Sequence, residues 1–144
     1  MLIGEYNHTI DSKRRVSMPA KFRKALGSRV VVTHGLDQSL FVFATKQWQT
    51  IVEKLSTLSM GSSDSRAFNR FLLAGAVDLE IDSLGRILLP DYLAEFAALD
   101  TKATLIGVSD RVEIWNEERW ESYKKRIESD ADVMAEKLGE LGVL

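Results

Sequence analysis

The sequence predicts an α+β fold built from two tandem copies of one half-domain. The first observation is an internal repeat, because residues 10–19 (IDSKRRVSMP) return as residues 81–90 (IDSLGRILLP) at a constant offset of 71 positions. The second is that each copy places short β-type runs around one short helical segment, in the order β-β-α-β-β. The third is size, since one copy of roughly 55 to 60 residues would be only marginally stable alone. We therefore expect the two halves to fold against each other.

The first copy combines four strands with one short helix. A polar turn separates its first two strands, and the Asp11 side chain can fix this turn by accepting bonds from backbone N–H groups two residues on. Pro19 has the fixed φ that suits the start of a helix, and Gly27 suits its end. The expected elements are strands over 7–10, 16–18, 29–33 and 40–43 and a helix over 19–26.

The second copy follows the same order. Its expected elements are strands over 79–81, 87–89, 103–106 and 112–115 and a helix from Pro90 to about Ala98. Between the copies, residues 61–64 are expected to cap a connecting helix over 66–73 that buries Phe68, Phe71 and Leu72. The chain thus divides into a first repeat with its helix (1–60), a connecting helix (61–73) and a second repeat with its C-terminal helix (74–144).

A longer helix with one apolar face follows each β unit. The first begins with Thr45 as its expected N-cap, and its face comprises Trp48, Ile51, Val52, Leu55 and Leu58. The second begins after Asn116, and its stripe comprises Trp120, Ile127, Ala131, Met134, Leu138 and Leu141. This stripe keeps a three-four spacing that is typical of a helix packed on another helix. Its partner is either the first helix of the same chain or a second copy of the chain.

Composition narrows the possible functions. The apolar share of 45% and the charged share of 28% are ordinary for a packed domain. No run of about 18 apolar residues suits a membrane span, and the first residues lack the pattern of a signal peptide, so a cytoplasmic protein is expected. With no cysteine and only His8 and His34, we expect no disulfide, no metal and no cofactor.

The net charge of −2 conceals an uneven distribution. Residues 13–29 carry seven Lys and Arg side chains and no acid, which leaves −9 for the rest of the chain. A local field of this sign attracts phosphate even when the whole protein is mildly acidic. Within this stretch, Lys21, Arg23 and Lys24 lie on the expected short helix, where they either steer DNA or form a solvated face.

Several motifs together resemble the MraZ family. They are the two Asp-x-x-x-Arg motifs followed by Pro, the Arg66-x-Phe68-x-Arg70-Phe71 segment, the Ala74-Gly75-Ala76 step and the Glu113-Ile114-Trp115 strand. The resemblance covers nearly the whole chain. It implies an AbrB-like, double-psi-type β-barrel, in which two swapped hairpins interlock, with peripheral helices. It also implies a nucleoid-associated transcriptional regulator that binds tandem promoter repeats of the division and cell-wall gene cluster as a ring-like homo-oligomer.

The resemblance assigns DNA contact to Arg15 and Arg86, oriented by Asp11 and Asp82. A guanidinium suits this role because it makes bidentate contacts with guanine edges or phosphate. The alternative is that each Asp–Arg pair only locks its turn. For Arg15 the resemblance favours DNA contact.

The neighbours of the two motif arginines differ between the copies. Lys13 and Arg14 add charge beside Arg15, whereas Leu84 and Gly85 add none beside Arg86, whose role stays open between DNA contact and structure. The family has Gly before the motif Arg, and Gly85 is a weaker candidate for a close backbone contact with DNA. In the first copy Arg14 takes this place, so its turn is either strained or different.

Two other classes of function compete with DNA binding. An enzyme could use Asp11 or Asp82 as a base, but the chain lacks a Cys nucleophile, a phosphate-binding Gly loop and a metal set, so we expect no enzyme and no small-molecule substrate. An AbrB-like antitoxin or scaffold protein would act through protein contacts. Such antitoxins generally carry one swapped-hairpin copy and a disordered tail, whereas this chain has two copies and a periodic final helix. The tryptophans are expected to pack in a core or an interface rather than stack on bases.

Overall fold

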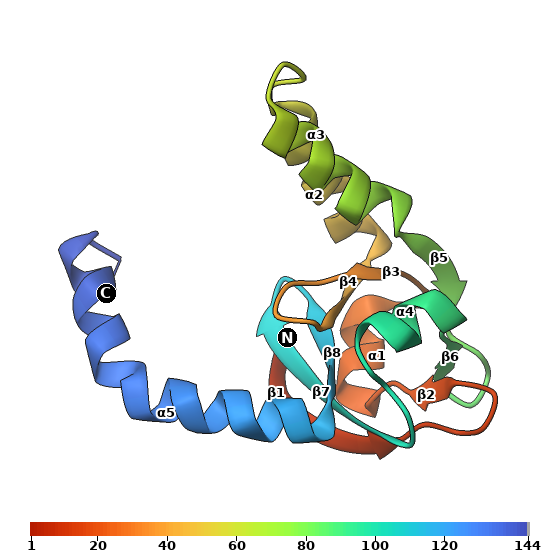
Figure 1. The fold of residues 1–144 in the computed structure, drawn as a ribbon. Helices are drawn as coiled ribbons and strands as arrows, with labels where there is room; N and C mark the ends of the chain where they lie inside the picture. Colours follow the sequence, from red (N-terminus) through yellow and green to blue (C-terminus); the bar gives the residue numbers. More distant parts are fainter. Residues whose placement is uncertain (144) are drawn as a thin grey trace.

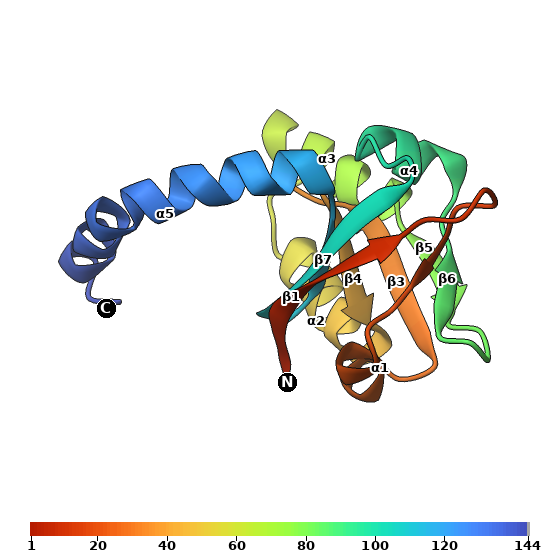
Figure 2. The same ribbon diagram turned by 90° about the horizontal axis from the view of Figure 1, so that it is seen from below.

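The two copies interlock, because every strand of the first copy pairs with a strand of the second (Figures 1 and 2). The computed structural model describes residues 1–143. Its strands are β1 (Leu2–Thr9), β2 (Arg15–Ser17), β3 (Arg29–His34), β4 (Leu40–Ala44), β5 (Val77–Glu80), β6 (Arg86–Leu88), β7 (Lys102–Ser109) and β8 (Val112–Asn116). Its helices are α1 (Ala20–Leu26), α2 (Thr45–Ser56), α3 (Ser63–Asn69), the π-helical turn η1 (Arg70–Ala74), α4 (Asp91–Phe96) and α5 (Glu117–Glu140).

Strand pairing follows an internal pseudo-twofold symmetry. One antiparallel sheet has the order β1-β7-β8-β4-β3-β5, and a separate two-stranded ribbon joins β2 to β6. The pairing of β1 with β7 in one half corresponds to that of β5 with β3 in the other. In the ribbon, Val16 lies opposite Ile87, its own counterpart in the second copy. This exchange of strands confirms the α+β, swapped-hairpin fold, although the six-stranded sheet is open, with β1 and β5 as its edges.

The core lies between the sheet and the ribbon and draws on both copies. Val16 and Ile87 are completely buried, as are Phe22 of α1 and Leu93 of α4, the corresponding residues of the two short helices. The Phe22 ring meets Tyr6 edge-on at 5.2 Å. Both repeats contribute to this one apolar cluster. Neither repeat could therefore bury its apolar residues alone, which agrees with the marginal stability expected for a single repeat of this length.

A second, smaller cluster anchors the start of α5. Trp115 and Trp120 are buried and meet at 5.2 Å between ring centroids, which confirms their expected packing role. Trp48 is half-buried and lies against Phe43 at 5.7 Å. Asn116 caps α5, as predicted, because its side-chain oxygen accepts the N–H of Arg119 at 3.0 Å.

Two local predictions are wrong. Thr45 is the first residue of α2 rather than its N-cap, because the helix continues directly from β4; Ala44 takes the cap position without a side-chain bond. The connecting segment buries Leu72 but leaves Phe68 38% exposed and Phe71 half-buried. The reason is that α3 projects away from the sheet beside α2 (Figure 1), so only its η1 continuation reaches the core.

The long helix α5 leaves the body of the molecule after its first turns (Figures 1 and 2). Trp120 is its one buried residue among those described, whereas Val133, Met134 and Leu138 are at least 40% exposed. Of the two partners that the sequence left open for this stripe, the Trp48–Leu58 helix of the same chain therefore does not cover it within the described residues. No helix within residues 1–143 combines the length and apolarity needed to cross a membrane.

Candidate nucleic-acid interface

The first Asp-x-x-x-Arg motif forms a tight turn between β1 and β2 that Asp11 holds together. Its Oδ1 accepts the backbone N–H groups of Lys13 at 2.9 Å and Arg15 at 3.0 Å. Its Oδ2 accepts the Nε–H of Arg15 at 2.6 Å. The carboxylate therefore orders the loop and fixes the direction of the Arg15 guanidinium at the same time.

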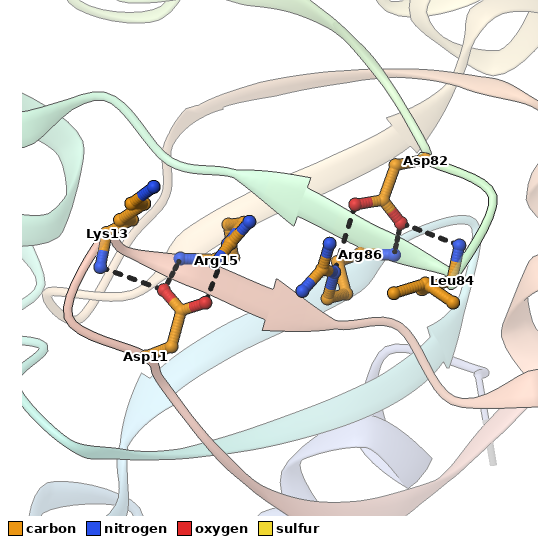
Figure 3. A network of polar contacts seen from close by, with 6 residues as sticks. All are labelled: Asp11, Lys13, Arg15, Asp82, Leu84 and Arg86. Atoms are coloured by element: carbon orange, nitrogen blue, oxygen red, sulfur yellow. Dashed lines mark hydrogen bonds and ion pairs between the residues drawn. The ribbon is translucent and has the colours of Figure 1, made fainter.

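The second motif repeats this geometry. Asp82 Oδ1 accepts the backbone N–H groups of Leu84 and Arg86, and Oδ2 accepts the Arg86 Nε–H, each at 2.9 Å. Figure 3 shows the two turns at opposite ends of the β2–β6 ribbon, with Arg15 and Arg86 toward its middle. Two arginines held by the same pattern of bonds are thus brought to one ribbon.

Residues 14 and 85 take the same backbone conformation despite their different side chains. Arg14 has φ 63° and Gly85 has φ 81°, both in the left-handed region that favours glycine. Each carbonyl then accepts an N–H from the opposite copy, Arg14 from Leu89 at 3.0 Å and Gly85 from Met18 at 2.8 Å. The first turn is therefore strained rather than different, and these bonds tie each loop to the other half of the fold.

The outer face of the ribbon carries four side chains. Val16 and Ile87 point into the core, so their neighbours along each strand point outward. The cross-strand pairs on this face are Arg15 with Leu88 and Ser17 with Arg86. The two partly exposed guanidiniums therefore lie on one face of a two-stranded ribbon.

The basic side chains are distributed differently from the sequence expectation. Arg14 turns toward α4, where its Nε lies 2.9 Å from Asp91 Oδ1, so part of its charge is neutralised. Arg23 of α1 lies directly over Gly85, where a Cβ would overlap its guanidinium. Leu84 and Gly85 add no charge beside Arg86, but strand exchange brings the basic helix of the first copy to the loop of the second.

Two further sequence candidates have no side-chain bond to the motif aspartates, although the backbone N–H of Lys13 is bonded to Asp11. Lys13 is exposed at the tip of the first loop, and Lys21 is exposed on α1. Three residues of this region were not identified from the sequence: Ser17 and Leu88 on the outer face of the ribbon, and Asp91, which pairs with Arg14. Alternation along a three-residue strand would have identified Ser17 and Leu88, but the Arg14–Asp91 pair depends on tertiary structure. Within residues 1–143 no group of three or more His, Cys, Asp and Glu side chains converges to hold a metal ion.

Gly85 and Arg14 offer a stability test of the two turns. We expect Gly85→Ala to lower the free energy of unfolding by about 1 to 2 kcal/mol, because a Cβ at positive φ is strained and would also displace Arg23. Arg14→Gly should change it by less, since relief of strain offsets loss of the Asp91 pair. Urea unfolding measures both. If both substitutions changed the free energy of unfolding by equal, small amounts, the backbone strain inferred for residues 14 and 85 would be contradicted.

The two motif carboxylates also make a pH prediction. Backbone N–H bonds from Arg15 and Arg86, opposed by desolvation and helped by the side-chain bonds, hold the pKa of Asp11 and of Asp82 below the usual 3.8. Because these folded-state pKa values are lowered, their stabilisation is fully present above the unfolded value and is lost as the pH falls through the folded values. Carboxyl NMR titration should find both midpoints below 3.8, and midpoints above it would contradict the bonding described.

Comparison with known proteins agrees with this geometry. A family model described as "MraZ protein, putative antitoxin-like" matches residues 1–71 and again residues 72–139. The chain belongs to the MraZ family. Among its relatives, proteins named "Transcriptional regulator MraZ" from Caldanaerobacter subterraneus subsp. tengcongensis and Thermoanaerobacter pseudethanolicus are 50% and 51% identical over 143 residues, covering 99% of this chain and 100% of each relative. One from Desulforamulus reducens is 45% identical over 141 residues, covering 98% and 99%.

The double match confirms that the MraZ unit occurs twice in this chain. Each matched segment contains one complete Asp-x-x-x-Arg turn, the first at Asp11 and the second at Asp82. The MraZ repeat is thus also the unit that the strand pairing exchanges: β2 from the first match is completed by β6 from the second. Both motif arginines consequently depend on both repeats for their position.

Proposed function

We propose that this chain is a sequence-specific DNA-binding transcriptional regulator. The observation that carries the proposal is the β2–β6 ribbon, which presents Arg15 and Arg86 on one outer face, each held by an aspartate in its own turn. The major groove of B-DNA admits a two-stranded ribbon, and arginine is the usual reader of guanine there. The names of its relatives, which call them transcriptional regulators, support this function.

The surrounding charges fit a phosphate backbone on both sides of the ribbon. Lys13 lies at one end, Arg23 of α1 covers the loop at the other end, and Lys21 is exposed on the same helix. Phosphate contacts position a protein on the duplex, whereas base contacts specify the sequence. We assign Arg15 and Arg86 to base contact, and Lys13, Arg14, Lys21 and Arg23 to positioning.

The resemblance to MraZ supplies the biological setting of the proposal. The DNA sites are tandem promoter repeats of the division and cell-wall gene cluster, and the protein acts in the cytoplasm in association with the nucleoid. Catalysis, a membrane and a small-molecule substrate have no part in this function.

The outer half of α5 supports self-association. Its exposed apolar side chains Met134 and Leu138 contact nothing else in the described chain that would bury them, and residues 128–140 carry five acids against Lys137 alone. Such an amphipathic, acidic helix suits a partner with an apolar groove and basic rim.

The same chain offers a matching groove beside α2 and α3. An apolar cavity of about 250 Å³ opens there, lined by Phe41, Phe43, Ile51, Leu55, Phe68 and Leu72. Residues 45–74 around it carry four basic and two acidic side chains. In Figure 1, α5 points away from this groove of its own protomer. If α5 of one copy binds in the groove of the next copy, the contact is head-to-tail. Such contacts generate a ring when the rotation between successive copies closes on itself.

An oligomer would present several ribbons to repeated sites, so that weak single contacts become strong together. The alternative function, an AbrB-like antitoxin or scaffold protein, is favoured by the same exposed α5 stripe, because that stripe could instead bind another protein. The two functions differ in the surface that provides the affinity. The charged loops would bind DNA, whereas the apolar stripe of α5 would bind another protein.

Salt dependence separates these functions. Affinity for promoter duplex should fall steeply with ionic strength, by about 0.9 log unit per phosphate contact per decade of salt. Removing Lys13 by K13Q should reduce the slope by about one such step. K125Q, which removes an exposed lysine of α5 outside its acidic outer half, should leave the slope unchanged. A slope near zero, or no retention of duplex at low salt, would contradict DNA binding and favour the scaffold.

A further inference from the structure

The outer face of the ribbon is chemically asymmetric although its backbone is symmetric. The register places Leu88 opposite Arg15 and Ser17 opposite Arg86. These positions correspond in the two copies, so symmetry would give both arginines the same cross-strand neighbour. Instead, one arginine has an apolar neighbour and the other has a hydroxyl.

Leu88 is exposed where a soluble protein would ordinarily place a polar residue. Its side chain is 56% accessible, and its strand neighbour Ile87 takes the buried position. Single exposed leucines are common on protein surfaces. This one, however, stands on the face that carries both aspartate-held guanidiniums, so a ligand read by Arg15 would necessarily approach Leu88.

On the basis of the proposed function, we propose that Leu88 contacts the 5-methyl group of a thymine adjacent to the base read by Arg15. The thymine methyl is the apolar group that bases display in the major groove, and apolar side chains read it there. The Arg86 half, with Ser17 as neighbour, has no such preference. The ribbon is then a directional reader that distinguishes the two ends of its site.

The spacing of the ribbon fits neighbouring base pairs. Directly opposed side chains on antiparallel strands have Cβ atoms about 4.5 to 5.5 Å apart, and stacked bases on one strand are about 3.4 Å apart. Two opposed side chains therefore reach adjacent base pairs without rearrangement of the strands. Arginine on guanine and leucine on the next thymine make a two-base contact from one cross-strand pair.

Replacement of thymine by deoxyuridine tests the assignment, because it removes the methyl group alone. The probe is the duplex most enriched when the full-length protein selects from a random pool, with each thymine replaced in turn. For the unchanged protein, one such replacement should weaken binding about fourfold, the effect of one buried methyl group. For Leu88→Ser, thymine and deoxyuridine at that position should bind equally.

Leu36→Ser is the matched control, because Leu36 is 52% exposed and lies in the β3–β4 turn away from the ribbon. It should keep the thymine preference. The inference is overturned if Leu88→Ser keeps that preference, if no thymine in the duplex responds, or if Leu88→Ser changes the oligomeric state in light scattering, which would make Leu88 a contact between copies. Failure to enrich any duplex would instead contradict the proposed function itself.

Discussion

Replacing Arg15 and Arg86 together by alanine should abolish specific retention of promoter DNA in a gel-shift while leaving the oligomer intact. Each bidentate arginine–guanine contact contributes about 1 to 3 kcal/mol of discrimination, so both changes together should cost at least about thirtyfold in specific affinity. The turns should survive, because Asp11 and Asp82 still accept the backbone N–H groups that hold them.

The single variants decide whether the two copies act alike. We expect Arg15→Ala and Arg86→Ala to weaken specific binding to a similar extent. Lys13 lies in the loop of Arg15, and strand exchange places Arg23 beside the loop of Arg86. Arg15→Lys keeps the charge but loses bidentate geometry, so it should retain non-specific binding and lose specificity. Arg126→Ala is the control, because Arg126 is exposed on α5 and lies outside both motif loops and the ribbon. Unchanged retention by Arg15→Ala would remove its assignment, and an effect of Arg15→Ala alone would make Arg86 a structural residue.

If the exposed stripe of α5 joins copies of the chain as proposed, charge placed on it should separate the oligomer into its protomers. Met134→Glu with Leu138→Glu introduces two carboxylates where apolar contact is expected, next to a segment that is already acidic. Affinity for DNA with tandem sites should fall by about 10²-fold or more as multivalency is lost, while affinity for one isolated site should stay unchanged. Light scattering and gel-shifts with one or several sites measure the two effects.

Ser129→Glu serves as the matched control for this prediction, because Ser129 is exposed on α5 but lies off the apolar stripe. It should preserve both the oligomer and tandem-site affinity. If the unchanged protein were a monomer at micromolar concentration, or if the double variant remained assembled, α5 would not be the self-association surface.

Sequence patterns predict the repeat, the element order and the N-cap of α5 because these depend on neighbouring residues, although the N-cap predicted for α2 at Thr45 is wrong. The Asp11 and Asp82 turns and the α5 cap at Asn116 all follow from local chemistry. Strand pairing, in contrast, could not be predicted from local sequence. A three-residue strand such as β2 carries no signal for its partner, and the exchange with β6 entered through the family resemblance.

The charge environment of the site could not be predicted for the same reason. Lys13, Arg14 and Arg15 are consecutive in sequence, yet Arg14 is drawn to Asp91 and away from its neighbours. Arg23 precedes Gly85 by more than sixty positions and still covers it. Proximity along the chain therefore overestimated the difference between the loops, since strand exchange places each loop beside the helix of the other copy. The exposure of Phe68 has a similar origin, because α3 follows α2 rather than the sheet.

Selection of bound duplexes from a random pool tests the central claim most directly. If the aspartate-held arginines of the ribbon read DNA, and several ribbons act together, the full-length protein should enrich a guanine-containing motif repeated at constant spacing, and the Arg15→Ala, Arg86→Ala double variant should enrich none. Absence of any enriched motif, or enrichment of the same repeat by that variant, would contradict the account.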